Sequence, residues 1–154
     1  MALEPRRHGL TILRRKSNSA AVGVTSNTIW GVVVTGPGAD ADLFPLNTPV
    51  LVPNVDAVLA DPTATGATGT LPTVLKALSQ HGRAAGVIVR VEIGAGEDAD
   101  DIADATDVNV IAGLEALRLA RQTLGVRPTI LATPGLDTIP VRAALAVTLQ
   151  KVKG

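Results

Sequence analysis

Three aliphatic runs constrain the fold of this chain most strongly, because each is long enough for a strand and a helical pattern follows each one. The runs cover residues 29–35, 85–93 and 128–133. Nearly continuous apolar character is typical of strands that are buried on both faces of a parallel sheet. Strands that alternate with helices predict right-handed crossovers. We therefore expect an α/β fold with a parallel or mixed sheet and helices on its faces.

The helices are indicated by the spacing of apolar residues and by proline and glycine near their ends. They are expected at residues 54–60, 71–82, 114–125 and 139–152, with Pro72 and Pro140 in first turns and Gly82 and Gly125 at C-caps. Residues 63–70 are rich in Thr and Gly and predict a surface loop. Residues 94–109 predict an acidic loop or a weak helix.

Composition narrows the class of protein. A chain of 154 residues suffices for one domain that buries about 70% of its unfolded surface. Basic and acidic residues number 14 each, which gives no bulk attraction to nucleic acid or to an anionic membrane. No run approaches the roughly 18 apolar residues of a membrane span. One Trp and one Phe are present and Cys is absent, so stacking platforms, disulfides and thiol chemistry are not expected.

The first 18 residues predict an extended arm, and residues 19–154 predict the α/β domain. Leu10 and Ile12 alternate with Thr11 as in a short strand. The first sixteen residues also hold five basic side chains against Glu4 alone, namely Arg6, Arg7, Arg14, Arg15 and Lys16. Two interpretations stay open for this segment: a disordered tail with at most one edge strand, and an arm that docks on a neighbouring subunit.

No pattern indicates catalysis, a metal or a cofactor. Glycine turns follow the strands at residues 35–38, 94–97 and 133–137, but a dinucleotide fingerprint and a P-loop are both absent. The acids of the 97–107 segment do not have calcium-loop spacing and are interpreted as a solvated face or as charge at a helix N-terminus. These acids are Glu97, Asp98, Asp100, Asp101, Asp104 and Asp107. We expect no catalytic, cofactor-binding or metal-binding residues, and no enzyme.

The segment Asp42–Val52 contains the one Phe of the sequence, Phe44, and two prolines, Pro45 and Pro49. Each proline removes a backbone donor and extends its predecessor, which predicts a rigid lead-in to an edge strand at residues 50–52. The run Phe-Pro-Leu-Asn-Thr-Pro-Val-Leu resembles the matching segment of contractile phage tail sheath proteins.

Further segments resemble the same family, especially the sheaths of temperate myoviruses and R-type bacteriocins, and they occur in the family's order. They are His8-Gly9-Leu10-Thr11-Ile12, Gly69-Thr70-Leu71-Pro72, Gly113-Leu114 with Ala116-Leu117, Gly125-Val126-Arg127-Pro128, Pro134-Gly135-Leu136-Asp137-Thr138 and Gln150-Lys151. The resemblance covers nearly all of the chain. Arg14 and Arg15 depart from it, because the family often has an acid and an apolar residue there.

The resemblance implies a structural subunit, or an N-terminal portion of one, in the tail sheath of a virion assembled in the bacterial cytoplasm. Such subunits stack as hexameric rings around an inner tube protein and exchange strands with neighbouring copies. Carried over, the donated strand is Gly9, Leu10, Thr11, Ile12 and Leu13, and the subunit-interaction residues also include Arg14 and Arg15. Family members continue well beyond the last helix expected here, so the domain is predicted to be incomplete at its C-terminus.

Two other functions remain open. The order of strands and helices also suits a small flavodoxin-like or Rossmann-like nucleotide-binding module or enzyme, on fold analogy alone. A bacterial interaction module derived from a captured prophage is the third possibility.

Overall fold

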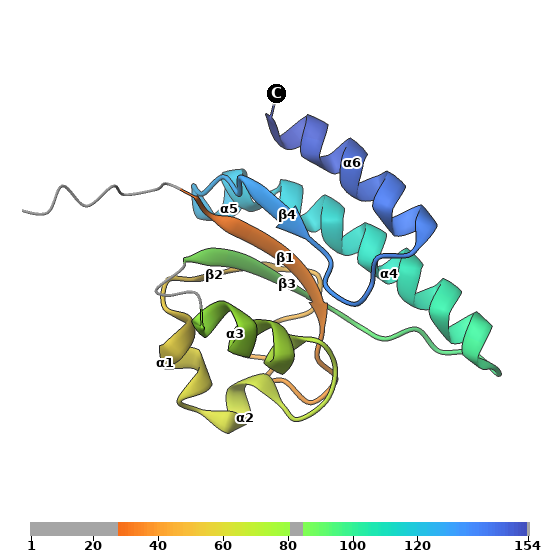
Figure 1. Cartoon of the computed structure of the whole chain (residues 1–154), viewed down its shortest axis with the longest axis horizontal. Helices are drawn as coiled ribbons and strands as arrows, with labels where there is room; N and C mark the ends of the chain where they lie inside the picture. Colours follow the sequence, from red (N-terminus) through yellow and green to blue (C-terminus); the bar gives the residue numbers. More distant parts are fainter. Residues whose placement is uncertain (1–27, 81–84, 154) are drawn as a thin grey trace, which may run out of the picture.

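A mixed four-stranded sheet lies between two layers of helices in the computed structural model, which describes residues 28–80 and 85–153 (Figure 1). The strands are β1 (Trp30–Thr35), β2 (Pro49–Val52), β3 (Gly86–Val91) and β4 (Ile130–Ala132). Their order across the sheet is β2-β3-β1-β4. β3 and β4 both pair with β1 in parallel, and β2 pairs with β3 in antiparallel. The predicted α/β class with a mixed sheet is confirmed.

Both central strands are buried along their whole length, because helices cover both faces of the sheet. Side chains alternate between the faces, as the pleat requires. The core on one face contains Trp30, Val32, Val34 and Ile88, packed against Phe44, Val52, Val55, Leu71, Val74 and Leu75. The core on the other face contains Val33, Val87, Val89 and Val91, packed against Val110, Leu114, Leu117, Ala120 and Val141.

The first face is covered by α1 (Val55–Leu59), α2 (Pro62–Thr65) and α3 (Leu71–Ser79), which lie together below the sheet in Figure 1. Asn54 and Asp61 cap α1 and α2 by accepting backbone hydrogen bonds, so the short helices begin where side-chain oxygens are available. The expectation of a surface loop at residues 63–70 is wrong for α2, which buries Ala64 and Thr65.

The second face is covered by α4 (Ala99–Arg118), α5 (Ala120–Leu124) and α6 (Ile139–Lys153) (Figure 1). The acidic segment forms the first turns of α4, so this helix begins much earlier than residue 114, where the sequence predicted its start. Asp98 explains this start, because its carboxylate accepts hydrogen bonds from the backbone amides of Asp100 and Asp101. Gly125 ends α5 in the left-handed conformation, with φ of 68°.

The last strand differs from its prediction. A buried strand was expected at residues 128–133, but β4 contains three residues that are exposed or half-buried. The reason is position, because β4 lies at an edge of the sheet and pairs only with β1 among the described residues. The sequence has the apolar character of a central strand, and the tertiary structure places it at a border.

Several predictions concern residues outside the described part of the chain. These are the arm at residues 1–18 and the C-cap at Gly82. Within the described residues, no helix combines the length and the apolar character that crossing a bilayer demands.

Candidate assembly surface

The predicted subunit-interaction residues are Gly9, Leu10, Thr11, Ile12, Leu13, Arg14 and Arg15, and all lie outside the described residues. Their role therefore stays a prediction. An assembly contact also needs a surface that accepts the segment of a neighbouring copy, and such a surface can lie within the described domain.

Phe44 anchors the proline-containing segment in the core. Its side chain is 2% exposed, whereas that of its neighbour Leu43 is 48% exposed. The backbone amide of Phe44 donates to the carbonyl of Asp40 at 2.8 Å, which closes a tight turn before the segment. The ring packs into the core beneath α1 and α3. The segment is thus fixed at one aromatic side chain.

Residues 46–48 then turn the chain into β2. Asn47 has φ of 53°, a left-handed conformation that Asn tolerates, and its amide donates to the carbonyl of Arg90 at 2.8 Å. The hydroxyl of Thr48 donates to the carbonyl of Leu46 at 3.1 Å. The strand that follows is at the edge of the sheet. The prediction of a lead-in to an edge strand is confirmed.

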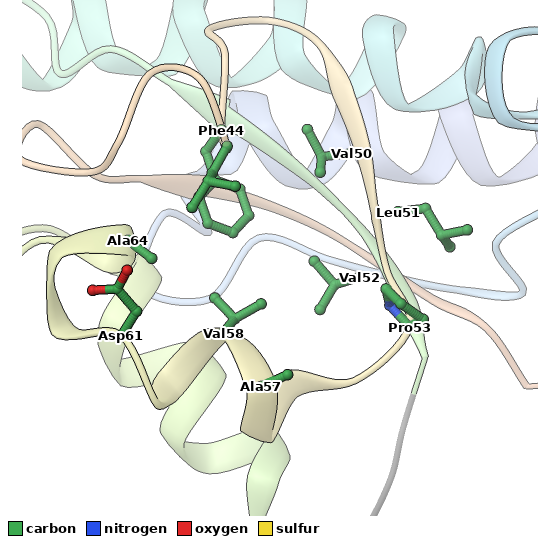
Figure 2. A pocket seen from close by; sticks show the side chains of 10 residues that line it. Phe44, Val50, Leu51, Val52, Pro53, Ala57, Val58, Asp61 and Ala64 are labelled. Atoms are coloured by element: carbon green, nitrogen blue, oxygen red, sulfur yellow. The ribbon is translucent and has the colours of Figure 1, made fainter.

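An open apolar groove of about 320 Å³ lies beside this edge strand, and we call it the β2 groove. Its lining comes from the Phe44 segment, from β2 with Pro53 and from α1 and α2. The lining residues are Leu43, Phe44, Val50, Leu51, Val52, Pro53, Ala57, Val58, Asp61 and Ala64. In Figure 2 the side chains of Val50 and Val52 point toward the side where Phe44 and Val58 lie, while Leu51 points away from them.

Asp61 is the charged residue of the β2 groove lining. A hydrogen bond from the hydroxyl of Thr63 at 2.6 Å, followed by one from the Thr63 amide at 2.9 Å, holds the pKa of this carboxyl below its ordinary value. The carboxylate caps α2 and is satisfied by its own helix. The groove therefore suits apolar contact and offers no polar chemistry.

At the end of β1, where a nucleotide would bind in a doubly wound fold, backbone packs closely against backbone, and an open pocket of about 280 Å³ lies at the same strand end, lined in part by Thr35 and Thr138. Thr70 donates its amide to the carbonyl of Thr35 at 2.9 Å and accepts the amide of Thr35 at its hydroxyl at 3.0 Å. A Cβ atom at Gly69 would lie 2.4 Å from that carbonyl oxygen, and one at Gly66 would lie 2.4 Å from the backbone of Gly38. These glycines allow backbone to press on backbone, so the first glycine turn is packed.

The second glycine turn is packed in a similar way against the start of α4. The amide of Gly94 donates to the hydroxyl of Thr106 at 2.8 Å, and that hydroxyl donates to the carbonyl of Ile102 at 2.6 Å. A Cβ atom at Gly96 would lie 2.4 Å from the Cβ atom of Asp101. The turn after β4 contains Gly135 with φ of 74°, a conformation that favours glycine.

Asp107 departs from the sequence interpretation of the acidic segment. It is 9% exposed and not part of a solvated face, and its carboxylate accepts a hydrogen bond from the hydroxyl of Thr138 at 2.6 Å. This bond ties α4 to the start of α6. The helical spacing from Asp107 to the buried Val110 and Leu114 is the signal that could have placed it on the inner face. No three acidic, His or Cys side chains within the described residues lie close enough to hold a metal ion.

Comparison with known proteins shows what this chain is similar to. No family model matches it. The tail sheath protein of Escherichia phage P2 is 36% identical over 155 residues, which cover 95% of this chain and 38% of that protein. The chain is a homologue of phage tail sheath proteins. The major tail sheath protein of Serratia phage KSP20 is 33% identical over 152 residues, again with 95% of this chain and 38% of that protein covered.

The chain therefore spans 38% of the length of these curated relatives. Both relatives have the names of structural proteins of a phage tail, and neither is named as an enzyme. The resemblance found in the sequence is confirmed.

Proposed function

We propose that this chain acts as a structural sheath subunit, or as part of one, in a contractile phage or bacteriocin tail, and not as an enzyme. The observation that carries the proposal is sequence identity of 33–36% with two tail sheath proteins over 95% of the chain.

The proposed mode of assembly is strand exchange. Residues 1–18 form an arm and residues 19–154 form the α/β domain, and residues 9–13 add a strand to the sheet of a neighbouring copy. Main-chain hydrogen bonds then supply affinity and alternate side chains supply specificity. Arg14 and Arg15 follow the strand and contact the neighbour through charge. The copies are arranged as hexameric rings around an inner tube protein, in a virion tail assembled in the bacterial cytoplasm.

The test compares the full chain with a variant that lacks residues 1–18. Sedimentation velocity and electron microscopy over a range of concentrations measure assembly. The full chain is expected to form concentration-dependent oligomers, and the deletion is expected to abolish them because the donated backbone is gone. Equal assembly of both proteins contradicts strand donation by the arm.

Point variants make the test sharper. In the proposed strand, Leu10 and Ile12 would lie on one side and Thr11 on the other, because successive side chains of a strand alternate. The double variant Leu10→Asp, Ile12→Asp is expected to weaken oligomers far more than the matched control Thr11→Asp. A monomer that gains thermal stability from nucleotides, with no effect of the arm, would favour the flavodoxin-like alternative.

A further inference from the structure

The helical layer of α4, α5 and α6 has an acidic end. Exposed carboxylates occupy the loop before α4 and the first turns of that helix, and no Lys or Arg occurs at residues 91–117. We call this group the acidic tip, and its members are Glu97, Asp98, Asp100, Asp101 and Asp104. In Figure 1 the start of α4 projects at the lower right, away from the sheet. The acidic tip is therefore a protruding feature that suits a concave partner.

The acidic tip is held in place by contacts of the loop before α4. The hydroxyl of Thr106 accepts the amide of Gly94 at 2.8 Å, and the side-chain amide of Asn109 donates to the carbonyl of Glu92 at 3.0 Å. These bonds fix the loop against the helix. A segment that is already ordered loses less conformational entropy when it binds a partner.

Most charges of the acidic tip have no counter-charge. Asp98 caps α4, but the carboxylates of Asp100, Asp101 and Asp104 have no hydrogen-bond or ion-pair partner among the described residues. Asp100 and Asp104 are four residues apart on one face of the helix, where like charges destabilise it. A cationic partner would relieve this repulsion.

A pocket of about 200 Å³ with basic walls lies at the other end of the same layer. It is formed where the end of α4, α5, the loop before β4 and the last turn of α6 converge. Its lining residues are Arg118, Arg121, Gln122, Arg127, Pro128, Lys151 and Val152, and we call it the basic pocket. The helix dipole accounts for a cation in the last turn of α4. It does not account for Arg127, which belongs to a loop.

Glu115 neutralises only part of the charge of the basic pocket. Its carboxylate contacts Nε of Arg118 at 2.9 Å and Nζ of Lys151 at 3.4 Å, which ties the end of α4 to the end of α6. Arg121 and Arg127 are exposed and form no ion pair within residues 28–80 and 85–153. A guanidinium group matches the geometry of a carboxylate. The basic pocket therefore suits a carboxylate-rich ligand.

The acidic tip and the basic pocket of one copy lie too far apart to pair with each other. Helix α4 has 20 residues, which corresponds to a length of about 30 Å. Exposed charges are largely screened beyond about 10 Å at 0.1 M salt. The net charge of the chain is zero, so the approach of a second copy meets no overall repulsion.

We propose that the basic pocket receives the acidic tip of a second copy of this chain, with Arg121 and Arg127 paired to Asp100 and Asp104. The inference rests on the proposed function, because a sheath subunit has copies of itself as neighbours. The contact joins two different surfaces, head to tail, so it repeats from copy to copy until a ring closes or a filament grows. It involves none of residues 1–18 and is therefore separate from strand donation.

A nucleic acid fits the basic pocket less well. Duplex DNA presents one charge for about every 1.7 Å of its axis, so its binding surfaces spread cations along a track. Here the cations converge on one small pocket beside the carboxylate of Glu115. The acidic tip instead presents a few carboxylates on the end of one helix.

The experiment uses the absence of cysteine in this chain. Gln122→Cys places one thiol in the basic pocket, and Ala99→Cys places one in the acidic tip without removing a charge. The two full-length variants are mixed, treated with a short bismaleimide and separated by size, with a tag on one partner to identify heterodimers. Thr73→Cys, at an exposed position of α3 in the other helical layer, replaces Ala99→Cys in the matched control.

The heterodimer yield is expected to exceed that of the control by about fivefold or more at low salt, because complementary charges favour this encounter. At about 1 M salt the yield should fall to that of the control, since the screening length is then about 3 Å. Equal yields for the two mixtures at low salt overturn the proposal.

A charge exchange makes the test specific. Adding Arg121→Glu and Arg127→Glu to the pocket partner should remove the excess yield, and adding Asp100→Lys and Asp104→Lys to the tip partner should then restore it. Restoration also shows that both variants are folded. Absence of restoration overturns the pairing.

Two further measurements separate the alternatives. With Leu10→Asp and Ile12→Asp added to both partners, the excess yield should remain, so that failure of strand donation and failure of this contact are distinguishable. Loss of the excess yield in these variants assigns the contact to the arm and overturns the proposal. Slower labelling of Gln122→Cys in a DNA duplex of about 20 base pairs, without an excess of heterodimer, assigns the basic pocket to nucleic acid and overturns it as well.

Discussion

Gly86 lies directly beneath the indole ring of Trp30. The two residues are the first pair of the β1–β3 ladder. A Cβ atom at residue 86 would lie 2.0 Å from Cδ2 of the indole. The missing side chain on β3 is what allows the large ring on β1 to lie flat over the neighbouring strand. Trp30 is 7% exposed there and belongs to the core beneath α3.

The substitution Gly86→Ala is expected to lower the free energy of unfolding by about 1–3 kcal/mol, because the ring has to move within a packed core. Gly38→Ala is the matched control, since its Cβ atom would lie 3.7 Å from the nearest atom. The control should change the free energy of unfolding by less than about 0.5 kcal/mol. Urea denaturation followed by Trp fluorescence measures both, and equal midpoints would contradict the packing relationship.

Phe44→Ala tests whether the proline-containing segment is anchored by its ring. The side chain is 2% exposed, so truncation is expected to destabilise the domain by about 3–5 kcal/mol through lost burial and a cavity. Leu43→Ala, at a neighbour that is 48% exposed, should cost less than about 1 kcal/mol. Chemical denaturation compares the two variants. Similar losses at both positions would mean that the ring does not fix the segment.

Arg90 supports the turn after β1 from the neighbouring strand. Its side chain is buried and donates from Nη1 to the carbonyls of Gly36 at 3.0 Å and Ala39 at 3.3 Å. Arg90→Met keeps the length and removes the donors, and it is expected to lower the free energy of unfolding by about 2–3 kcal/mol because buried carbonyls lose their partner.

The matched control for this prediction is Arg118→Met. Arg118 forms an exposed ion pair with Glu115 at 2.9 Å, and such pairs contribute roughly 0–1 kcal/mol. In thermal unfolding, the melting temperature of Arg90→Met should therefore be clearly lower than that of Arg118→Met. A loss at Arg118 as large as that at Arg90 would show that the buried carbonyl contacts are not what stabilises the turn.

Asp61 provides a prediction about pH. Its pKa is lowered from the ordinary value of 3.8, first by the hydroxyl of Thr63 and then by the Thr63 amide. Because the folded-state pKa is depressed, the stabilising contribution of the carboxylate is present above 3.8 and is lost as the pH falls through the folded-state pKa.

Thr63→Val removes the larger cause, so the pKa of Asp61 should rise toward its ordinary value. Carboxyl chemical shifts followed by NMR between acidic and neutral pH measure the change. Thr48→Val serves as the control, because the hydroxyl of Thr48 donates to a backbone carbonyl and not to a carboxylate. An unchanged titration of Asp61 in Thr63→Val would assign the shift to the backbone hydrogen bond.

The sequence by itself determined the class of the fold and much of its local structure. The aliphatic runs at residues 29–35 and 85–93 predicted the two buried strands, because burial on both faces requires apolar side chains at every position. The prolines at 45 and 49 predicted the edge strand β2, since missing donors are tolerated at an edge. Gly125 marked a helix end through its left-handed conformation. These are local consequences of backbone chemistry.

Tertiary structure alone decided which residues meet across the chain. The sequence predicted that Asp107 is a solvated acid, but the chain leading into α6 places the hydroxyl of Thr138 at its carboxylate. The sequence also predicted a buried strand at residues 128–133, but the order of the strands places β4 at an edge of the sheet. Nothing in the sequence around Gly86 indicates that the indole ring of Trp30 lies above it. Such contacts join residues far apart in sequence. Their free energy depends on distances in the folded structure, which the spacing of apolar residues along the sequence does not reveal.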